Sequence, residues 1–314
     1  MHATVFSPDD DRRSNAGSAP PVADAQGSAG LAAPEPGAPP TCAFSIDVED
    51  WYQSTIDYDA PISERVVRNI DRVLGFLDDC GVKGTFFVQG KVAEAFPRIL
   101  ADVLRDGHEI QSHGYSHRPL YGMDRAALRR ELEMAVKTVE DACGVRVTAF
   151  RAPDFSILPR NLWALETLAE LGFEVDSSIF PMRTSRYGVP GWGVGPHHVP
   201  LANGLSIFEV PVAIGRVGPF RIPVAGGGYF RLLPQRLLDV AIRSILEERR
   251  PVVIYCHPYE FSPHEMDDYR GKVSPWYRLH QSIGRDSLVR RVRHLLTSLP
   301  FGRFDEVIAE WKHR

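Results

Sequence analysis

Short apolar runs alternate along the chain with stretches in which apolar residues recur every three or four positions. The clearest run, at residues 251–256, is apolar without alternation, as is typical of a parallel strand covered on both faces. Similar runs predict strands at residues 42–47, 85–88, 108–111, 147–150, 173–175 and 207–210. Helical spacing predicts helices at residues 66–77, 92–104, 124–139, 162–171, 232–246 and 288–299. This alternation indicates a mostly parallel sheet or barrel with functional groups at the carboxyl ends of its strands.

The chain divides into three predicted regions. More than half of residues 1–40 are Ala, Gly, Pro or Ser, which leaves too little apolar surface to offset the entropy of ordering, so we expect a disordered leader there. We expect a barrel over residues 41–260 and a C-terminal extension, packed on the barrel, over residues 261–314.

Charge and composition exclude several classes of protein. The 36 Lys and Arg residues against 40 Asp and Glu residues give a net charge of −4, which argues against a nucleic-acid binder that neutralises phosphates. No apolar run approaches the ~18 residues of a membrane span, and the N-terminus has no apolar segment typical of an export signal, so we expect a cytoplasmic location. The four widely spaced cysteines form no C-x-x-C pair, so neither a disulfide framework nor a zinc knuckle is indicated.

Polar clusters follow the predicted strands. Two histidines four residues apart on one helical turn can chelate one ion, and a carboxylate from elsewhere completes a three-ligand site that leaves positions open for water. Such an arrangement is typical of a hydrolytic metal centre. The clusters are Asp47-Val-Glu49-Asp50, His113-Gly-Tyr-Ser-His117 and His257.

Five segments in order give the chain a resemblance to a known family. Residues 45–52, 111–117, 150–153, 176–178 and 254–258 resemble the five signatures of the NodB-homology polysaccharide deacetylases, carbohydrate esterase family 4, over roughly residues 41–260. The D-V-E-D-W start at residues 47–51, together with a tail from His257-Pro-Tyr-Glu-Phe to Pro300-Phe-Gly302, is most similar to the exopolysaccharide deacetylases associated with exosortase and PEP-CTERM clusters.

The resemblance implies an α/β fold, a distorted (β/α) barrel of about seven strands. It also implies a divalent metal ion and the removal of N-acetyl groups from an amino-sugar polysaccharide, in exopolysaccharide biosynthesis. The spacing of the first motif leaves open whether Glu49 or Asp50 faces the metal, and we assign Asp50, His113 and His117 as ligands. A nitrogen and oxygen ligand set favours Zn²⁺ over Co²⁺ or Ni²⁺.

The family match also implies the catalytic roles. Asp47 is expected to be the general base, oriented and kept ionised by Arg151. His257 is expected to protonate the departing amine, with Asp176 as its hydrogen-bond partner.

Substrate contacts are expected beside these residues. A backbone N–H at or near Phe155 is expected to stabilise the tetrahedral oxyanion together with the metal. Trp51, Tyr52, Pro153 and Phe155 are expected to bind the substrate, because aromatic faces suit the apolar side of a sugar ring. The family pattern is broken at Asp154, where many members carry an aromatic residue.

Two other functions stay open. The same fold also serves hydrolases of cyclic ureides or formyl-amines, and the chain could instead be a carbohydrate-binding module with a disabled site. The second alternative is disfavoured because every expected catalytic position holds a competent residue. The glycine run at residues 226–228 is expected to be a turn or rim loop, since no Gly-Lys-Ser/Thr follows it.

Overall fold

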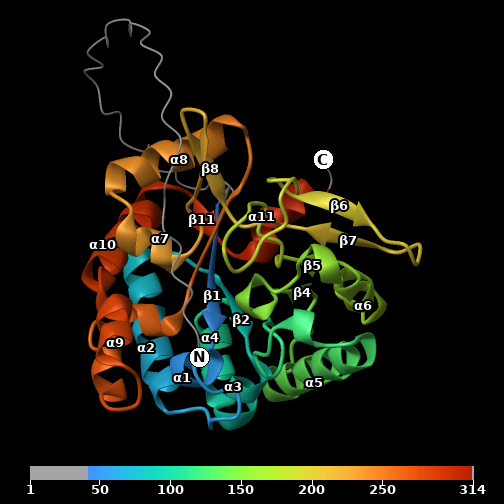
Figure 1. Cartoon of the computed structure of the whole chain (residues 1–314), viewed down its shortest axis with the longest axis horizontal. Coiled ribbons are helices and arrows are strands. Elements are labelled where there is room, and N and C mark those ends of the chain that lie inside the picture. Colours follow the sequence, from blue (N-terminus) through green and yellow to red (C-terminus); the bar gives the residue numbers. More distant parts are fainter. Residues whose placement is uncertain (1–41, 313–314) are drawn as a thin grey trace, which may run out of the picture. The chain divides into compact units, whose positions relative to one another are not determined.

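The computed structural model describes residues 42–312, so the predicted leader at residues 1–40 lies outside the described residues. Within them, the main sheet holds nine strands, of which seven are adjacent and parallel (Figure 1). The order of these seven is β10 (Val252–Cys256), β1 (Cys42–Val48), β2 (Thr85–Val88), β3 (Glu109–Ser112), β4 (Ala149–Phe150), β5 (Val175–Asp176) and β7 (Ser206–Glu209). This arrangement confirms the predicted α/β fold with a mostly parallel sheet of about seven strands.

Smaller strands complete the sheet. β6 (His197–Pro200) runs antiparallel to β7, and β11 (Phe301–Gly302) pairs in parallel with β1. β8 (Ile214–Val217) and β9 (Phe220–Pro223) form a separate hairpin. Ala213 N–H donates to Val253 O at 2.9 Å, and Tyr255 N–H donates to Ala225 O at 2.8 Å. The chain that follows β7 therefore hydrogen-bonds to β10 at the other end of the parallel array, as in a distorted barrel.

Helices surround this sheet. Figure 1 shows α2, α9 and α10 along one side of the molecule and α5 and α6 along another. None of the helices between residues 42 and 312 is long and apolar enough to cross a membrane. The helices are α1 (Trp51–Thr55), α2 (Arg65–Cys80), α3 (Gly90–Ala95), α4 (Arg98–Arg105), α5 (Arg125–Cys143), α6 (Ala164–Glu170), α7 (Gly227–Leu232), α8 (Gln235–Glu247), α9 (Pro275–Ser282), α10 (Arg285–Ser298) and α11 (Phe304–Trp311).

Several helix ends lie where the sequence places them. Gly81 ends α2 with a φ of 66°, a left-handed conformation that costs glycine little. Asp124 caps α5 by accepting a hydrogen bond from Ala127 N–H at 2.7 Å. Within the predicted helix at residues 92–104, a break at Phe96 and Pro97 separates α3 from α4, because proline interrupts helical hydrogen bonding.

The second half of the chain is more ordered than its irregular pattern suggests. Residues 180–230 contain β6, β8, β9 and the start of α7, whereas the apolar pattern predicts only the strand at residues 207–210 there. The glycine run is not a rim loop, because Gly226 precedes α7 and Gly227 begins it. The sequence pattern also misses β11, α9 and α11.

The C-terminal residues share the core of the barrel. All seven residues of β1 are buried, as expected for a strand covered on both faces. Leu288 and Val292 of α10 and Phe304 of α11 are fully buried in the same apolar cluster as Phe44 and Ile46 of β1. Residues 285–308 therefore contribute to the hydrophobic core around β1.

Candidate active site

The two acidic residues that follow β1 serve different structures. Asp50 caps α1, because its Oδ1 accepts hydrogen bonds from the N–H groups of Tyr52 at 2.9 Å and Gln53 at 3.2 Å. Its Oδ2 accepts a third from Ser63 N–H at 3.0 Å. The prediction that Asp50 is the carboxylate ligand is therefore wrong, because these bonds hold it against the helix and Glu49 faces the histidines instead.

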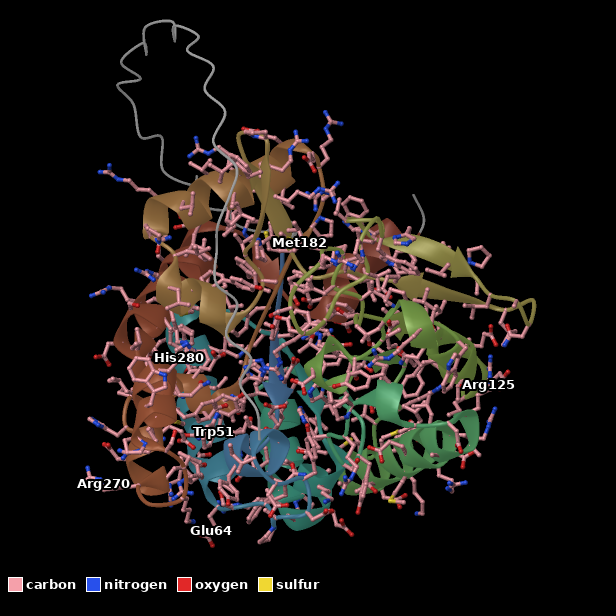
Figure 2. All side chains as sticks on the ribbon, in the orientation of Figure 1. Trp51, Glu64, Arg125, Met182, Arg270 and His280 are labelled. Atoms are coloured by element: carbon pink, nitrogen blue, oxygen red, sulfur yellow. The ribbon has the colours of Figure 1, made fainter. Side chains whose placement is uncertain are left out.

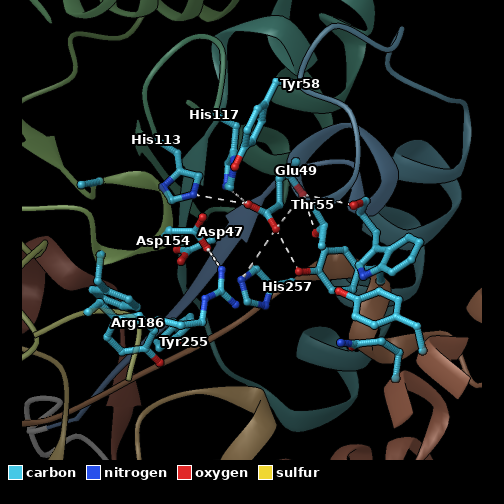
Figure 3. Close-up of a pocket in the computed structure, with 18 residues that line it drawn as sticks. Asp47, Glu49, Thr55, Tyr58, His113, His117, Asp154, Arg186, Tyr255 and His257 are labelled. Carbon is cyan, nitrogen blue, oxygen red and sulfur yellow. Dashed lines mark hydrogen bonds and ion pairs between the residues drawn. The ribbon is translucent and has the colours of Figure 1, made fainter. Parts of the chain in front are cut away.

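Glu49 lies at the centre of a cluster of imidazoles (Figure 3). Its Oε2 lies 3.5 Å from His113 Nε2 and contacts His117 Nε2. One ligand atom from each of these three buried residues lies within 4.8 Å of the others. The other carboxylate oxygen of Glu49, Oε1, lies 3.8 Å from His257 Nε2. Two imidazole nitrogens and a carboxylate oxygen that converge in this way form a donor set that suits a divalent cation such as zinc.

The two paired histidines lie on a loop after β3, not on the helical turn that we predict from their spacing. Gly114 and His117 both adopt left-handed backbone conformations, with φ values of 73° and 64°. His113 N–H donates to Val88 O at 2.9 Å, and His113 Nδ1 lies 2.9 Å from Arg151 O. Because a carbonyl only accepts, this contact places the proton on Nδ1 and leaves the lone pair of Nε2 directed at the cluster.

Glu131 of α5 holds this loop in place, a role that the sequence pattern does not reveal. Its Oε1 accepts hydrogen bonds from the backbone N–H groups of Tyr115 at 3.0 Å and Ser116 at 2.6 Å, and from Ser116 Oγ at 2.8 Å. A carboxylate that satisfies three donors fixes the loop more firmly than neutral hydrogen bonds would.

Asp47 and Arg151 form a buried ion pair, as the family resemblance implies. Arg151 Nη1 donates to Asp47 Oδ1 at 2.7 Å and to Ser45 Oγ at 2.7 Å, and Nη2 donates to Ser177 Oγ at 3.2 Å. The guanidinium carbon lies 4.2 Å from the centre of the Phe87 ring. With its cation enclosed in this way, Arg151 fixes the orientation of the Asp47 carboxylate.

His257 pairs with Glu260. Glu260 Oε2 lies 3.1 Å from His257 Nδ1 and accepts a hydrogen bond from His257 N–H at 3.0 Å. The His257 ring also stacks on Tyr259, with ring centroids 5.0 Å apart. The prediction that Asp176 holds His257 is wrong, because Asp176 instead accepts hydrogen bonds from the N–H and Oγ of Ser178 at 3.2 and 2.5 Å.

Asp176 belongs to a second buried carboxyl pair, between β5 and β7. It lies opposite Glu209 in the parallel register, so the two buried carboxyl groups are neighbours on adjacent strands. Burial and the charge of Asp176 raise the pKa of Glu209 well above its ordinary value. The raised pKa favours the protonated form of Glu209, whose Oε1 accepts from Ile179 N–H at 3.2 Å.

Burial and mutual contacts set the charges of Glu49 and His257 in the cluster. Burial raises the pKa of Glu49, but His117 and His257 lower it by more, so it ends well below its ordinary value. Burial lowers the pKa of His257, but Glu49 and Glu260 outweigh this effect and raise it to about 9. In the metal-free protein Glu49 is therefore ionised and His257 protonated at neutral pH.

These groups line one cavity of about 210 Å³. Asp47, Glu49, His113, His117 and His257 all contribute to its walls. In Figure 3 Asp154 and Arg186 lie on one side of the cluster, and the ribbon of the C-terminal region lies on the other. The remaining lining residues are Trp51, Ser54, Thr55, Tyr58, Ala152, Phe155, Tyr187, Tyr255, Tyr259, Tyr277 and Gln281.

The aromatic residues predicted beside the acidic cluster divide between cavity and core. Trp51 lines the cavity but is only 2% exposed, because its ring packs against Tyr269 at a centroid distance of 4.5 Å. Tyr52 does not line the cavity, and its ring stacks on that of Tyr269 with centroids 5.8 Å apart. The position of Tyr52 therefore gives no support to its predicted substrate contact.

The segment after Arg151 departs from prediction in one place. Phe155 lines the cavity, whereas Pro153 is buried at the start of a 3₁₀ turn outside the lining. Phe155 N–H donates to Ala152 O at 3.1 Å, so this group is already paired within the turn, and an oxyanion contact at or near Phe155 stays a prediction.

The sequence analysis missed the groups that hold Glu49 and His257. Tyr259 O–H and Ser54 O–H both donate to Glu49 Oε1, at 2.9 and 3.1 Å. Glu260 carried a usable signal, because a carboxylate three residues after a histidine reaches it across one turn. Ser54 carried none, since it belongs to a short helix that only the folded chain brings to the cluster.

Comparisons with known proteins divide the chain near residue 176, well before the boundary predicted at residue 260. Residues 54–175 match the polysaccharide deacetylase family, and residues 177–309 match DUF3473, a domain of unknown function. A peptidoglycan-N-acetylglucosamine deacetylase of Bacillus cereus is 32% identical over 96 residues, which cover 30% of this chain and 35% of that protein. The match thus spans about a third of the relative's length.

Two solved structures share the fold. A protein of Mycobacterium smegmatis described as a candidate polysaccharide deacetylase superposes with a TM-score of 0.57 at 21% identity, covering 90% of this chain and 94% of the other. The Puue allantoinase superposes with a TM-score of 0.58 at 17% identity, covering 89% and 92%. At these identities the likeness establishes the fold alone. By sequence, residues 54–175 are thus similar to the polysaccharide deacetylase family, and residues 177–309 are similar to the DUF3473 family.

Proposed function

We propose that the chain is a metal-dependent N-deacetylase that acts on N-acetylhexosamine residues of a polysaccharide. One observation carries the proposal: a single cavity is lined by the carboxylate–imidazole cluster, by Asp47, which pairs with buried Arg151, and by His257, which pairs with Glu260. Amide hydrolysis needs a polarised carbonyl, a nucleophile and a proton donor, and these three groups supply the corresponding chemistry.

Glu49, His113 and His117 would hold the cation. Their donor atoms converge, and His113 Nε2 is left free for a metal by the contact of Nδ1 with Arg151 O. Bound there, a divalent ion would polarise the acetamide carbonyl and lower the pKa of water to about 7. We propose zinc rather than cobalt or nickel, because two imidazoles and one carboxylate are a common catalytic zinc set.

Asp47 acts as the general base in this proposal. Its carboxylate lines the cavity and is oriented by Arg151, whose Nη1 donates to Oδ1 at 2.7 Å. It accepts a proton from the water that attacks the acetamide carbonyl.

His257 acts as the general acid. With a pKa raised to about 9 it carries a proton at neutral pH in the metal-free protein, and its Nε2 faces the cluster while Glu260 holds Nδ1. It donates the Nε2 proton to the departing amine as the carbon–nitrogen bond breaks. Glu260 takes the orienting role that the sequence analysis gives to Asp176.

We further propose exopolysaccharide biosynthesis as the setting and the exosortase-associated deacetylases as the subfamily. The support is the D-V-E-D-W start together with a tail that lies largely inside the DUF3473 match.

The test is acetate release from an N-acetylglucosamine oligomer by the zinc-loaded protein. We expect His113→Ala and Asp47→Ala to abolish release, because they remove a ligand and the base. His264→Ala is the matched control, since this imidazole is exposed and outside the cavity, and it should keep full activity. Full activity in both site variants would contradict the assignment.

The same assay separates the alternatives. Preferred hydrolysis of a ureide or a formyl-amine would replace the proposed substrate class. Saccharide binding with no bound zinc and no turnover would identify a non-catalytic module.

A further inference from the structure

Helix α9 lies at the cavity although no side chain of this helix is buried. Ser274 Oγ caps it by accepting from Tyr277 N–H at 3.2 Å. Trp276 is 77% exposed and Leu279 is 56% exposed. Core packing therefore does not explain the apolar composition of this helix.

Two residues of α9 line the cavity. Tyr277 and Gln281 are four residues apart, so they lie on one face of the helix. The Tyr277 ring is 6.1 Å from that of Trp51, which places α9 beside α1 (Figure 2). The carbonyl of Gln281 accepts hydrogen bonds from Arg231 Nη1 at 2.6 Å and Arg285 Nε at 2.8 Å, which fix the end of the helix at the cavity.

The polar groups of this face are unused by the protein. Across residues 42–312, neither the Tyr277 hydroxyl nor the side-chain amide of Gln281 has a hydrogen-bond partner. An amide offers two donors and an acceptor, and a tyrosine offers a flat apolar face with a polar tip. This combination matches a pyranose ring, which has an apolar face and hydroxyl groups around its edge.

The size of the cavity adds a second argument. Its volume of about 210 Å³ lies below the ~300–1,000 Å³ of pockets that enclose a drug-sized ligand. It therefore has room for an acetamido group with little more than one sugar ring, and the rest of a polymer has to cross the rim. Helix α9 forms part of that rim.

We propose that α9 is a saccharide-binding wall, in which Tyr277 packs against the sugar that carries the acetamido group and Gln281 bonds its hydroxyls. This inference rests on the proposed function for the choice of ligand. It gives part of the DUF3473 region, whose match spans residues 177–309, a defined role in holding substrate.

The experiment measures the full-length protein in two ways with an N-acetylglucosamine tetramer. Steady-state acetate release by the zinc-loaded protein gives kcat and KM, and calorimetric titration of the metal-free protein gives Kd. We expect Tyr277→Ala and Gln281→Ala each to raise KM and Kd about tenfold, with kcat within about threefold of wild type. Tyr277→Phe should keep most of the affinity, because the ring face is retained.

Trp276→Ala is the matched control. Trp276 neighbours Tyr277 on the same helix but does not line the cavity, so its loss should leave KM and Kd unchanged. Wild-type KM and Kd in both wall variants would overturn the proposal, and so would an equal loss in Trp276→Ala. If Tyr277→Ala fails to fold, Gln281→Ala decides by the same criterion.

The two readouts separate this inference from the proposed function. Loss of saccharide affinity in the wall variants of a protein that releases no acetate would support the wall and contradict the deacetylase. Acetate release with unchanged KM and Kd in the wall variants would support the deacetylase and contradict the saccharide-binding wall.

Discussion

At the residue scale, neighbouring acidic residues serve different ends. Asp50 caps α1 and Glu49 faces the imidazoles. A short carboxylate caps a helix well because it reaches the N–H groups of the first turn, and glutamate is not among the preferred caps. This preference was available in the sequence, since Asp50 precedes the helix-forming Trp-Tyr-Gln-Ser, and it would have favoured Glu49 as the ligand.

The first prediction separates the two roles. Glu49→Gln should abolish zinc binding in calorimetric titration, because an amide is a poor replacement for a ligating carboxylate. Asp50→Ala should keep zinc affinity within a fewfold of wild type but lower the free energy of unfolding in urea by about 1–2 kcal/mol. Greater loss of zinc affinity in Asp50→Ala than in Glu49→Gln would contradict this assignment.

The second prediction concerns Glu260. Glu260→Gln should lower the pKa of His257 below about 9, because the neutral amide removes one of the charges that raise it. We expect kcat/KM to fall by about tenfold or more, as the general acid loses its orienting anion. The His257 pKa is measured by NMR titration of the metal-free protein, and kcat/KM by acetate release.

Glu265→Gln is the control for this variant. Glu265 is also a buried carboxylate of the C-terminal region, but it bonds Asn69 and Tyr269 outside the cavity. An equal fall in kcat/KM for both variants would attribute the effect to general destabilisation and not to His257.

At the element scale, the start of α7 positions the His257–Glu260 pair. A Cβ atom on Gly227 would lie 2.1 Å from Glu260 Oε2, a distance that no real contact allows. A Cβ atom on Gly228 would meet nothing within 4 Å. The glycine at the first position of α7 therefore leaves room for the carboxylate that holds His257.

The third prediction uses this difference. Gly227→Ala should push Glu260 away from His257 and lower kcat by about tenfold, while zinc affinity stays near wild type. Gly228→Ala should change neither quantity. Kinetics and zinc titration on the two alanine variants measure both, and wild-type kcat in Gly227→Ala would show that the contact can relax without consequence.

The fourth prediction concerns the carboxyl pair between β5 and β7. The pKa of Glu209 is raised in the folded protein, so its contribution to stability is present below its unfolded pKa of about 4.5 and is lost as pH rises through the folded value. Glu209→Gln should keep an acceptor for Ile179 N–H without titrating. The variant should therefore lose less stability than wild type between pH 5 and pH 8 in urea unfolding, and an unchanged pH slope would contradict a protonated Glu209.

How far the sequence predicts these elements depends on how local their causes are. Apolar runs and caps identify β1, β10 and α5, because each depends on neighbouring residues alone. The conformation of the loop that carries His113 and His117 could not be predicted in this way. It depends on hydrogen bonds to Glu131 and on left-handed backbone conformations, neither of which the spacing of the histidines indicates.

At the scale of the whole molecule, contacts distant in sequence complete the site. β11 pairs with β1 through only two residues, and Tyr259 reaches Glu49 across 210 positions. Such pairings give no periodic signal, so the sequence predicts the parallel sheet and the strand ends that hold the chemistry but not the partners supplied by the C-terminal region. The family resemblance gave Asp47, Arg151 and His257, and folding added Glu260 and Tyr259.

The fifth prediction tests whether a cation joins these parts. The proposed ligands follow β1 and β3, and His113 contacts the carbonyl of Arg151 after β4, so zinc would tie together the ends of three strands of the parallel sheet. A ligand that binds only the folded state at 100 times its Kd adds about 2.7 kcal/mol, which corresponds to a rise in Tm of about 5–10 °C for a domain of this size. Calorimetric melting of the chelator-treated protein with and without zinc should show this rise. His264→Ala should retain the rise in Tm and His113→Ala should lose it, because His113 belongs to the cluster and His264 lies outside it. A rise of equal size in His113→Ala would mean that zinc binds elsewhere and that the cluster is not its site.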